Sequence, residues 1–252
     1  LDHMQFLGNT VREIAGEKAG IIVPGVPVIY DGNDKDAAEV IAAKAKELGS
    51  PAYKVVQGEA KVLGNNKDGI DFCLKDGYYG DTRFHIPFIA WYQVMNASLA
   101  LITMEVLKDK LPVGMEQLQA GIKNTRWQGR METILPGVIV DGAHNEDGVR
   151  RFVETAERFQ EEYPLTLLFS AVNDKDYQDM IHTICSRIRF RKVVTTEVGG
   201  YREVPSAKLA EIFRKEGCRE VGNSDNIEEA FHMACEAKRE GGMLFWVGSV
   251  YL

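Results

Sequence analysis

The second half of the chain alternates short apolar runs with longer amphipathic stretches. The apolar runs predict strands at 137–142, 165–172, 192–198 and 242–250. The amphipathic stretches predict helices at about 146–162, 174–187, 205–216 and 227–241. Because parallel strands are joined by crossover helices, this alternation predicts an open, doubly wound and mostly parallel α/β sheet.

The first half has a more mixed pattern. Thr10 and Glu13 have the spacing of a capping box, which predicts a helix that runs to Ala19 and ends at Gly20. An apolar strand is expected at 26–30, and a helix from about 34 to 48. We therefore predict the α/β class for the whole chain.

Two signals follow before the middle of the chain. Asp76-Gly77 lies between two strand-like runs, which is a common signal of a β-hairpin. The stretch 88–107 is apolar on most faces and predicts a helix. Its polar residues, among them Gln93 and Asn96, favour a buried core helix over a membrane span.

The pattern of predicted elements changes near the middle of the chain, which indicates a domain boundary. A short helix is expected at 114–123 and an extended link at about 124–129. We place the boundary in this link, with one domain at 1–125 and the other at 126–252.

Composition limits the classes of function. The 252 residues are 45% hydrophobic and 27% charged, as in globular proteins. No apolar run approaches the roughly 20 residues that cross a bilayer, and no signal peptide is visible. A net charge of −7 without any long Lys/Arg block argues against a nucleic-acid partner. The four cysteines form no CxxC motif and are predicted to be reduced thiols of a cytoplasmic protein.

Polar residues gather where one apolar strand ends. Asp141, His144 and Asn145 follow the strand at 137–142 and precede a helix. Ligands of open α/β sheets bind at this carboxyl edge, and a helix N-terminus favours phosphate. Asp141 is then a candidate for binding ribose hydroxyls. Alternatively, Asp141 and Asn145 only end the strand and cap the helix, with His144 exposed.

The next strand ends in the same way, with the segment VNDKD at 172–176. Two adjacent strand ends rich in polar residues indicate one shared crevice. A solvated turn, in which an aspartate caps the next helix, fits the segment equally well.

The link between the domains carries Arg126, Trp127 and Arg130. An arginine at a domain junction can bind a phosphate held by either domain. A surface ion pair of Arg130 with Glu132 or another acidic residue is an equal alternative.

Three polar positions in the first half are less specific by themselves. Gln93 and Asn96 lie one turn apart on an apolar helix, and a purine edge or a backbone carbonyl would satisfy them. His3 is a lone histidine, and Lys18 complements the dipole at a helix end. The residues alone thus predict a two-domain α/β protein with an anion or nucleotide crevice at the domain junction.

Several short motifs, taken together, indicate a resemblance to a known family. Residues 1–21 read LDHMQFLGNTVREIAGEKAGI and match the pattern LDHxxxLGxTxxxIAxEKAGI almost without departure. YQVMNASLA, WQGRME, VDGAHN, DKD and GSVYL follow in order. Over its whole length the chain resembles the folylpolyglutamate synthase/dihydrofolate synthase family of the Mur ligase superfamily. It departs at Tyr92, where the family usually has His, and at Glu146, where Pro is frequent.

The resemblance implies a fold and a reaction. It implies part of a Mur-type ATPase domain at 1–125, followed by a Rossmann-like C-terminal ligase domain at 126–252. The implied reaction adds L-glutamate to a reduced folate, or makes dihydrofolate from dihydropteroate, through an acyl phosphate. ATP and Mg²⁺ are required, with a monovalent cation as a further option.

The resemblance also implies roles in binding metal and nucleotide. His3 matches a magnesium ligand. Lys18 matches a lysine that is carbamylated and then faces a second magnesium, a modification that needs a neutral amine and is favoured by burial. Asn96 matches a residue that contacts adenine.

Further roles fall in the second domain. Arg130 matches an arginine that reaches the ATP phosphates, and Asp141 and His144 match a pair brought to the nucleotide. Lys18, Arg130 and His144 are therefore the expected catalytic residues. The incoming glutamate is expected near the strand ends, including Asp174 and Lys175.

The chain contains no GxxxxGK[ST] phosphate loop. We therefore expect a C-terminal fragment that lacks the phosphate-loop region and is inactive by itself. Two alternatives stay open: a Mur-type ligase that joins another amino acid to a UDP-muramoyl precursor, and a non-catalytic nucleotide-binding or interaction module.

Overall fold

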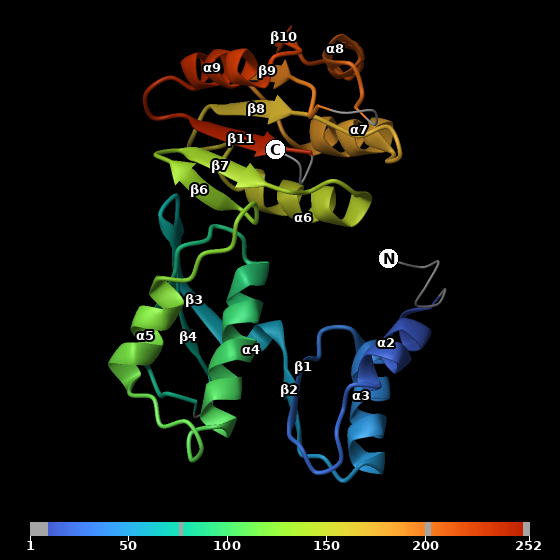
Figure 1. The fold of residues 1–252 in the computed structure, drawn as a ribbon. Coiled ribbons are helices and arrows are strands. Elements are labelled where there is room, and N and C mark those ends of the chain that lie inside the picture. The colour runs from blue at the N-terminus through green and yellow to red at the C-terminus, as the bar shows by residue number, and fades with distance from the viewer. Residues whose placement is uncertain (1–9, 76–77, 200–202, 249–252) are drawn as a thin grey trace. The chain divides into compact units, whose positions relative to one another are not determined.

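The computed structural model describes residues 10–75, 78–199 and 203–248. The chain divides into two compact units, shown in Figure 1. The first contains residues 1–87 and 91–125, and the second contains residues 88–90 and 126–252. Each unit has its own sheets and helices, so the predicted α/β class is confirmed.

The second unit is built on one six-stranded sheet with the order β10-β9-β8-β11-β7-β6. Neighbouring strands are parallel, except that β6 is antiparallel to β7. The elements are β6 (Glu132–Leu135), β7 (Val138–Asp141), α6 (Glu146–Ala156), β8 (Leu165–Phe169), α7 (Tyr177–Arg187), β9 (Lys192–Thr195), α8 (Ser206–Lys215), β10 (Val221–Asn223), α9 (Ile227–Lys238) and β11 (Met243–Val247). The prediction of a mostly parallel sheet in this half is confirmed.

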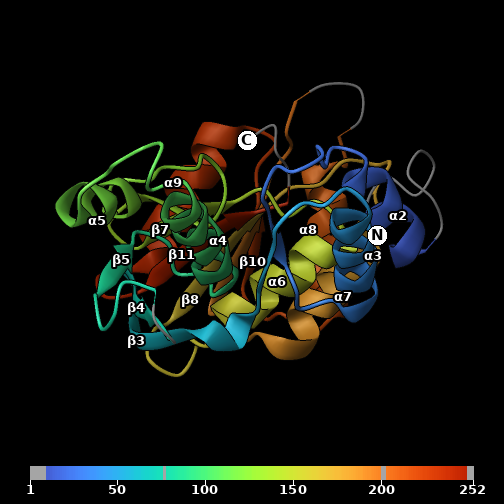
Figure 2. The same ribbon diagram turned by 90° about the horizontal axis from the view of Figure 1, so that it is seen from below.

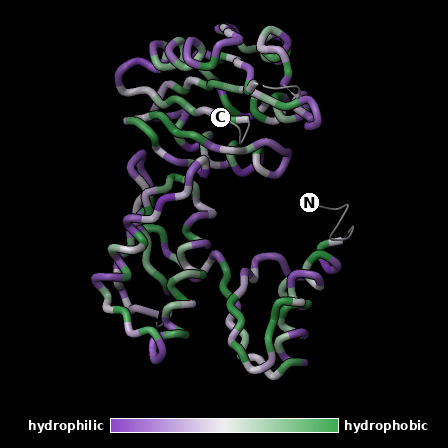
Figure 3. Tube along the Cα trace, viewed as in Figure 1, coloured by the Kyte–Doolittle hydropathy of each residue, from purple (hydrophilic) through white to green (hydrophobic). Residues whose placement is uncertain are grey.

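Helices cover both faces of this sheet, as Figure 2 shows from below. On one face, α9 packs Ala230 and Ala234 against the strands. On the other face, Phe152 of α6 meets Phe245 edge-on, with ring centroids 5.4 Å apart. All five residues of β8 are buried. Strands buried on both faces read as continuous apolar runs, which is why the pattern located them (Figure 3).

Three features of this sheet differ from the prediction. β6 was not predicted as a strand, because three of its four residues are exposed at the sheet edge. β10 was missed because it has only three residues. β11 lies between β7 and β8, so the two polar strand ends predicted to be adjacent are separated by one strand.

The first unit contains two small sheets. Its elements are α2 (Val11–Ala19), β1 (Val28–Asp31), α3 (Lys35–Glu47), β2 (Ala52–Val55), the 3₁₀ turn η1 (Gln57–Glu59), β3 (Ala60–Asn66), β4 (Gly69–Leu74), β5 (Phe84–Ile86), α4 (Tyr92–Val106) and α5 (Met115–Lys123). β1 and β2 are parallel and joined through α3, whereas β3, β4 and β5 form an antiparallel sheet.

The capping box predicted for the first helix is confirmed. The Thr10 hydroxyl accepts a hydrogen bond from the Glu13 N–H at 3.2 Å, and the Glu13 carboxylate accepts one from the Thr10 N–H at 3.2 Å. α2 ends at Ala19, as predicted. α4 begins at Tyr92 rather than at Phe88, and no helix of the described segments is long and apolar enough to cross a membrane.

The predicted hairpin signal at Asp76-Gly77 lies between two strands that pair antiparallel, β4 and β5. Asp76 and Gly77 themselves lie outside the described residues, and the second strand, β5, begins at Phe84. The tight hairpin joins β3 to β4, where Asn66 pairs with Gly69. Gly69 has a φ of 141°, which few other residues adopt, and the Asn66 side chain accepts the Asp68 N–H at 2.8 Å. Asp68-Gly69 is therefore a second turn signal of this sheet, which was not singled out from the sequence.

Candidate functional site

A short loop before β6 is fixed against the end of β7. Gly129 and Met131 have positive φ values of 64° and 51°. The Gly129 carbonyl accepts a hydrogen bond from the Gly142 N–H at 2.7 Å. Met131 is fully buried and anchors the loop. A non-glycine residue at positive φ costs free energy, so surrounding contacts must hold this loop in place.

Asp141 supplies one of those contacts. Its carboxylate accepts the Met131 N–H at 2.9 Å with one oxygen and the Ala143 N–H at 3.0 Å with the other. The residue is only 5% exposed. Burial raises the pKa of Asp141 to about 6, against the opposing effects of the two N–H groups and of Arg130. Asp141 thus ties the loop to β7, and each oxygen keeps a further lone pair for a ligand.

Arg130 lies on the exposed side of this loop. Its guanidinium carbon is 5.9 Å from the centre of the Trp127 ring, and Trp127 is 51% exposed. No ion pair joins Arg130 to Glu132, whose carboxylate accepts the Gly129 N–H at 3.0 Å. Among the described residues Arg130 forms no ion pair. The loop therefore presents a positive charge beside an aromatic ring. Hydrogen bonds fix its backbone, and the guanidinium is not engaged in an ion pair with any described residue.

His144 and Asn145 lie between β7 and α6. The Nδ1 atom of His144 is 2.7 Å from the Gly142 carbonyl oxygen, which requires the proton on Nδ1 and leaves Nε2 available. His144 is half-buried rather than exposed. Asn145 caps α6, because its side-chain oxygen accepts the Gly148 N–H at 2.8 Å. The structure therefore brings Arg130, Asp141 and His144 together at one corner of the sheet.

The carboxyl ends of other strands in the sheet add further polar groups. At the end of β8, Asp174 is exposed and Lys175 is half-buried. Asp176 caps α7 through the Asp179 N–H, so the alternative predicted for this turn holds for that aspartate.

Sequence reasoning missed two hydroxyl groups at this edge. Ser170 follows β8 and Thr196 follows β9, and both are fully buried. Neither hydroxyl has a hydrogen-bond partner within the described part of the chain. A hydroxyl directly after an apolar run was the available signal.

Asn96 lies on α4 in the first unit, where it is exposed. Its amide nitrogen donates to the Gln93 side-chain oxygen at 2.8 Å, which leaves its own oxygen as a free acceptor. Gln93 is 3% exposed, and its Nε2 has no partner among the residues described. A buried amide donor without a partner is unusual and is compatible with a ligand at this point.

Two predicted site residues, Lys18 and His3, remain. Lys18 is exposed in the last turn of α2, so burial does not favour the neutral amine that carbamylation needs. His3 lies outside the described residues. The described segments contain no group of three His, Cys, Asp or Glu residues that could hold a metal.

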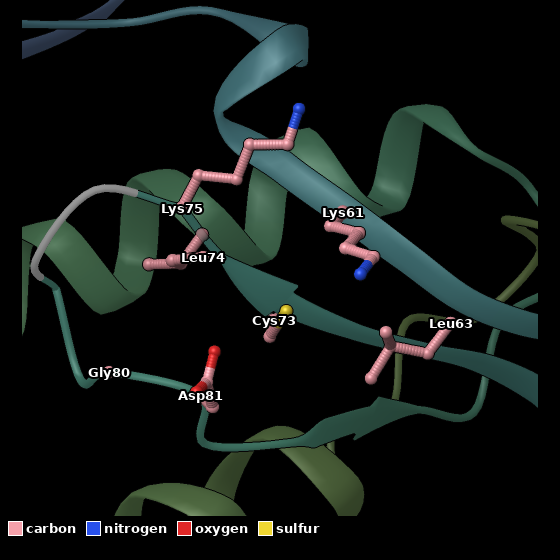
Figure 4. Close-up of a pocket in the computed structure, with 7 residues that line it drawn as sticks. All are labelled: Lys61, Leu63, Cys73, Leu74, Lys75, Gly80 and Asp81. Carbon is pink, nitrogen blue, oxygen red and sulfur yellow. The ribbon is translucent and has the colours of Figure 1, made fainter.

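A separate pocket of about 410 Å³ lies beside β3 and β4, and none of the predicted site residues lines it. Figure 4 shows Lys61, Cys73 and Asp81 around it. Its lining mixes two lysines and one aspartate with apolar side chains.

Comparisons with known proteins agree on one family. Residues 129–250 match the family described as Mur ligase, glutamate ligase domain. The chain is 35% identical over 201 residues to a dihydrofolate synthase/folylpolyglutamate synthase of Bacillus subtilis, covering 75% of this chain and 46% of that protein. It is 31% identical over 188 residues to a folylpolyglutamate synthase of Lacticaseibacillus casei, covering 71% and 43%.

Solved structures give the same result. A folylpolyglutamate synthase from Thermotoga maritima aligns with a TM-score of 0.78 and 25% identity, over 96% of this chain and 56% of that chain. A point mutant of L. casei FPGS aligns with a TM-score of 0.74 and 26% identity, over 100% and 57%. The chain thus spans about half the length of the proteins that it matches.

Proposed function

Since this chain belongs to the folylpolyglutamate synthase/dihydrofolate synthase family, we propose that the protein containing it uses ATP to join L-glutamate to a reduced folate or to dihydropteroate. A carboxylate oxygen of the acceptor attacks the γ-phosphorus of ATP, and ADP leaves. The neutral amine of glutamate then attacks the acyl carbon, an amide bond forms and phosphate leaves.

The loop that carries Arg130 is the observation that supports this proposal most directly. Phosphoryl transfer depends on positioned positive charge rather than on a covalent step by the protein. Hydrogen bonds to Asp141 and Gly142 hold the backbone of the loop, while the Arg130 guanidinium stays exposed. In our proposal Arg130 binds phosphate oxygens of ATP, and Asp141 acts chiefly as a positioning residue for it.

The other groups of the proposal bind the nucleotide. The Nε2 atom of His144 accepts a ribose hydroxyl when the ring is neutral, or donates to a phosphate oxygen when it is protonated. The free side-chain oxygen of Asn96 is suited to the exocyclic amine of adenine, and Gln93 fixes the orientation of that amide. Structures of an FPGS–AMPPCP complex and of an FPGS–AMPPCP–folate complex exist among the related proteins.

The incoming glutamate and the metal ion complete the proposal. Lys175 and the polar strand ends near it are our candidates for the incoming glutamate. Mg²⁺, with His3 and a carbamylated Lys18 as ligands, is proposed from the family resemblance alone. The described residues do not by themselves form a magnesium site, since Lys18 is exposed and no group of three His, Cys, Asp or Glu residues among them could hold a metal.

The test uses the full-length protein with ATP, L-glutamate and either dihydropteroate or tetrahydrofolate, and detects the glutamylated product by mass. Arg130→Gln is expected to lower kcat by about 100-fold, as loss of one electrostatic group typically does. Arg150→Gln is the matched control, because Arg150 is an exposed arginine paired with Glu146 on α6; its kcat should equal that of the wild type.

Two results would overturn the proposal at different levels. A wild-type protein that glutamylates neither acceptor contradicts the function, and glutamylation of a UDP-muramoyl precursor would favour the other Mur-type reaction. If the Arg130→Gln variant has an unchanged kcat, the proposed reaction stands but the proposed role of Arg130 is contradicted.

A further inference from the structure

Two cysteines that are far apart in the sequence meet in the second unit. Cys185 lies on α7, and Cys218 lies in the turn that follows α8. Their sulfur atoms are 3.6 Å apart and share a hydrogen bond. Both thiols are free and partly accessible, so a small molecule can reach them.

The backbone holds both sulfur atoms in place. α7 buries Ile181 and Ile184, and Cys185 directly follows the second of them. α8 ends in a Schellman motif, in which Gly217 has a φ of 93° and the Cys218 N–H donates to the Phe213 carbonyl at 3.0 Å. The position of Cys218 is therefore set by the helix end rather than by a free loop.

A second polar contact joins the same two elements. The Nδ1 atom of His182 on α7 is 3.0 Å from a carboxylate oxygen of Glu216, at the end of α8. These four side chains were not found to form a metal-binding group in the described part of the chain. Two free thiols 3.6 Å apart are placed for thiol–disulfide exchange.

We propose that Cys185 and Cys218 form a reversible disulfide by exchange with a low-molecular-weight disulfide. The Cys218 thiolate attacks one sulfur of the external disulfide, forming a mixed disulfide and releasing one small thiolate. Cys185 then gives up its proton and attacks the Cys218 sulfur, which releases the second small thiolate. The two protein thiols are oxidised, and the external disulfide is reduced to two thiols that take up the two protons.

Electrostatics favour Cys218 as the attacking group. The hydrogen bond shared with Cys185 lowers the pKa of the Cys218 thiol. The same hydrogen bond, followed by burial, raises the pKa of Cys185. The thiolate is the reactive species in exchange, and the two sulfurs need to approach to about 2.05 Å, which side-chain rotations from 3.6 Å can provide.

The other two cysteines provide internal controls. Cys73 is buried in the first unit. Cys235 lies on α9 and packs against the hydrophobic core that contains Ala230 and Ala234. No other pair of thiols in contact occurs among the described residues.

The experiment incubates the native chain with oxidised glutathione, blocks the remaining thiols and identifies linked peptides by mass spectrometry. We expect the chain to lose two hydrogen atoms in mass and to yield one cross-linked peptide pair, containing Cys185 and Cys218. Dithiothreitol should reverse the change. The oxidised chain should also unfold at a higher urea concentration than the reduced chain, because the cross-link restricts the unfolded state.

Variants separate the two steps. Cys185→Ser should stop at a glutathione adduct on Cys218, whereas the double variant Cys73→Ser/Cys235→Ser should form the cross-link as the wild type does. The proposal is overturned if the native chain forms no cross-link, if it forms only after denaturation, or if the linked peptides contain another pair. Because the wild-type chain itself gives the main result, a variant that fails to fold does not decide the outcome.

Discussion

At the residue scale, Asp141 shows how a candidate ligand can also be a structural group. The sequence pattern identified it at the end of a strand, and the structure gives both of its oxygens a backbone N–H. The pattern did not reveal Met131 as a partner. Met131 adopts a positive φ, which is unusual for methionine and therefore not predictable from the residue type. Its hydrogen bond to Asp141 also joins residues ten positions apart.

The raised pKa of Asp141 predicts a dependence of stability on pH. Its folded pKa of about 6 lies above the unfolded value of 3.8, so the folded state holds the proton more tightly. The stability that this group contributes is complete below about pH 4 and is lost as pH rises through about 6, a change of about 3 kcal/mol. Urea unfolding across this range measures it.

Asp141→Asn is the matched control, because it removes the titration while keeping the shape of the side chain. Its stability relative to the wild type should therefore rise between about pH 4 and pH 7. A difference between the two proteins that does not vary with pH would contradict the assignment. Other carboxyl groups titrate in both proteins and cancel in the comparison.

At the element scale, local signals located most helices and the buried strands. The capping box at Thr10 and the long apolar run at 165–172 each specify one element through neighbours in the sequence. β6 and β10 escaped because their residues are exposed or few, and only pairing with β7 or β9 makes them strands. Strand pairing between residues far apart in the sequence cannot be predicted from a local pattern of residues.

The start of α2 gives a direct test at this scale. Thr10→Ala removes the side-chain acceptor for the Glu13 N–H and should destabilise the helix by about 1 kcal/mol. Hydrogen exchange at the Glu13 amide should become faster. Thr10→Ser keeps the hydroxyl and should exchange like the wild type; equal exchange in all three proteins would show that the cap contributes little.

At the scale of the whole molecule, the proposed division into an ATP-binding part and a ligase part rests on the link near residue 125. The compact units are divided between Thr125 and Arg126, and the residues from 123 to 128 are exposed. The order of strands was less accessible to sequence reasoning. That order depends on where the chain returns into the sheet, which periodicity does not encode.

Limited proteolysis checks the division. Trypsin should cut first after Arg126 and leave a resistant fragment that begins at Trp127, because an exposed link offers its backbone more readily than packed helices do. N-terminal sequencing or mass spectrometry identifies the fragment. Arg126→Gln should slow this cut selectively, whereas early cuts inside α6 or β8 would show that the second unit is not an independent body.

The place of β11 has a consequence for the order of events in folding. It is the last described strand along the chain, yet it lies between β7 and β8 and pairs with both. During synthesis, β8, β9 and β10 can pair early, whereas β7 cannot join them because β11, the strand between β7 and β8, has not yet been made. The six-stranded sheet becomes continuous only when the final strand arrives, so the ribosome must release nearly the whole unit before its core closes.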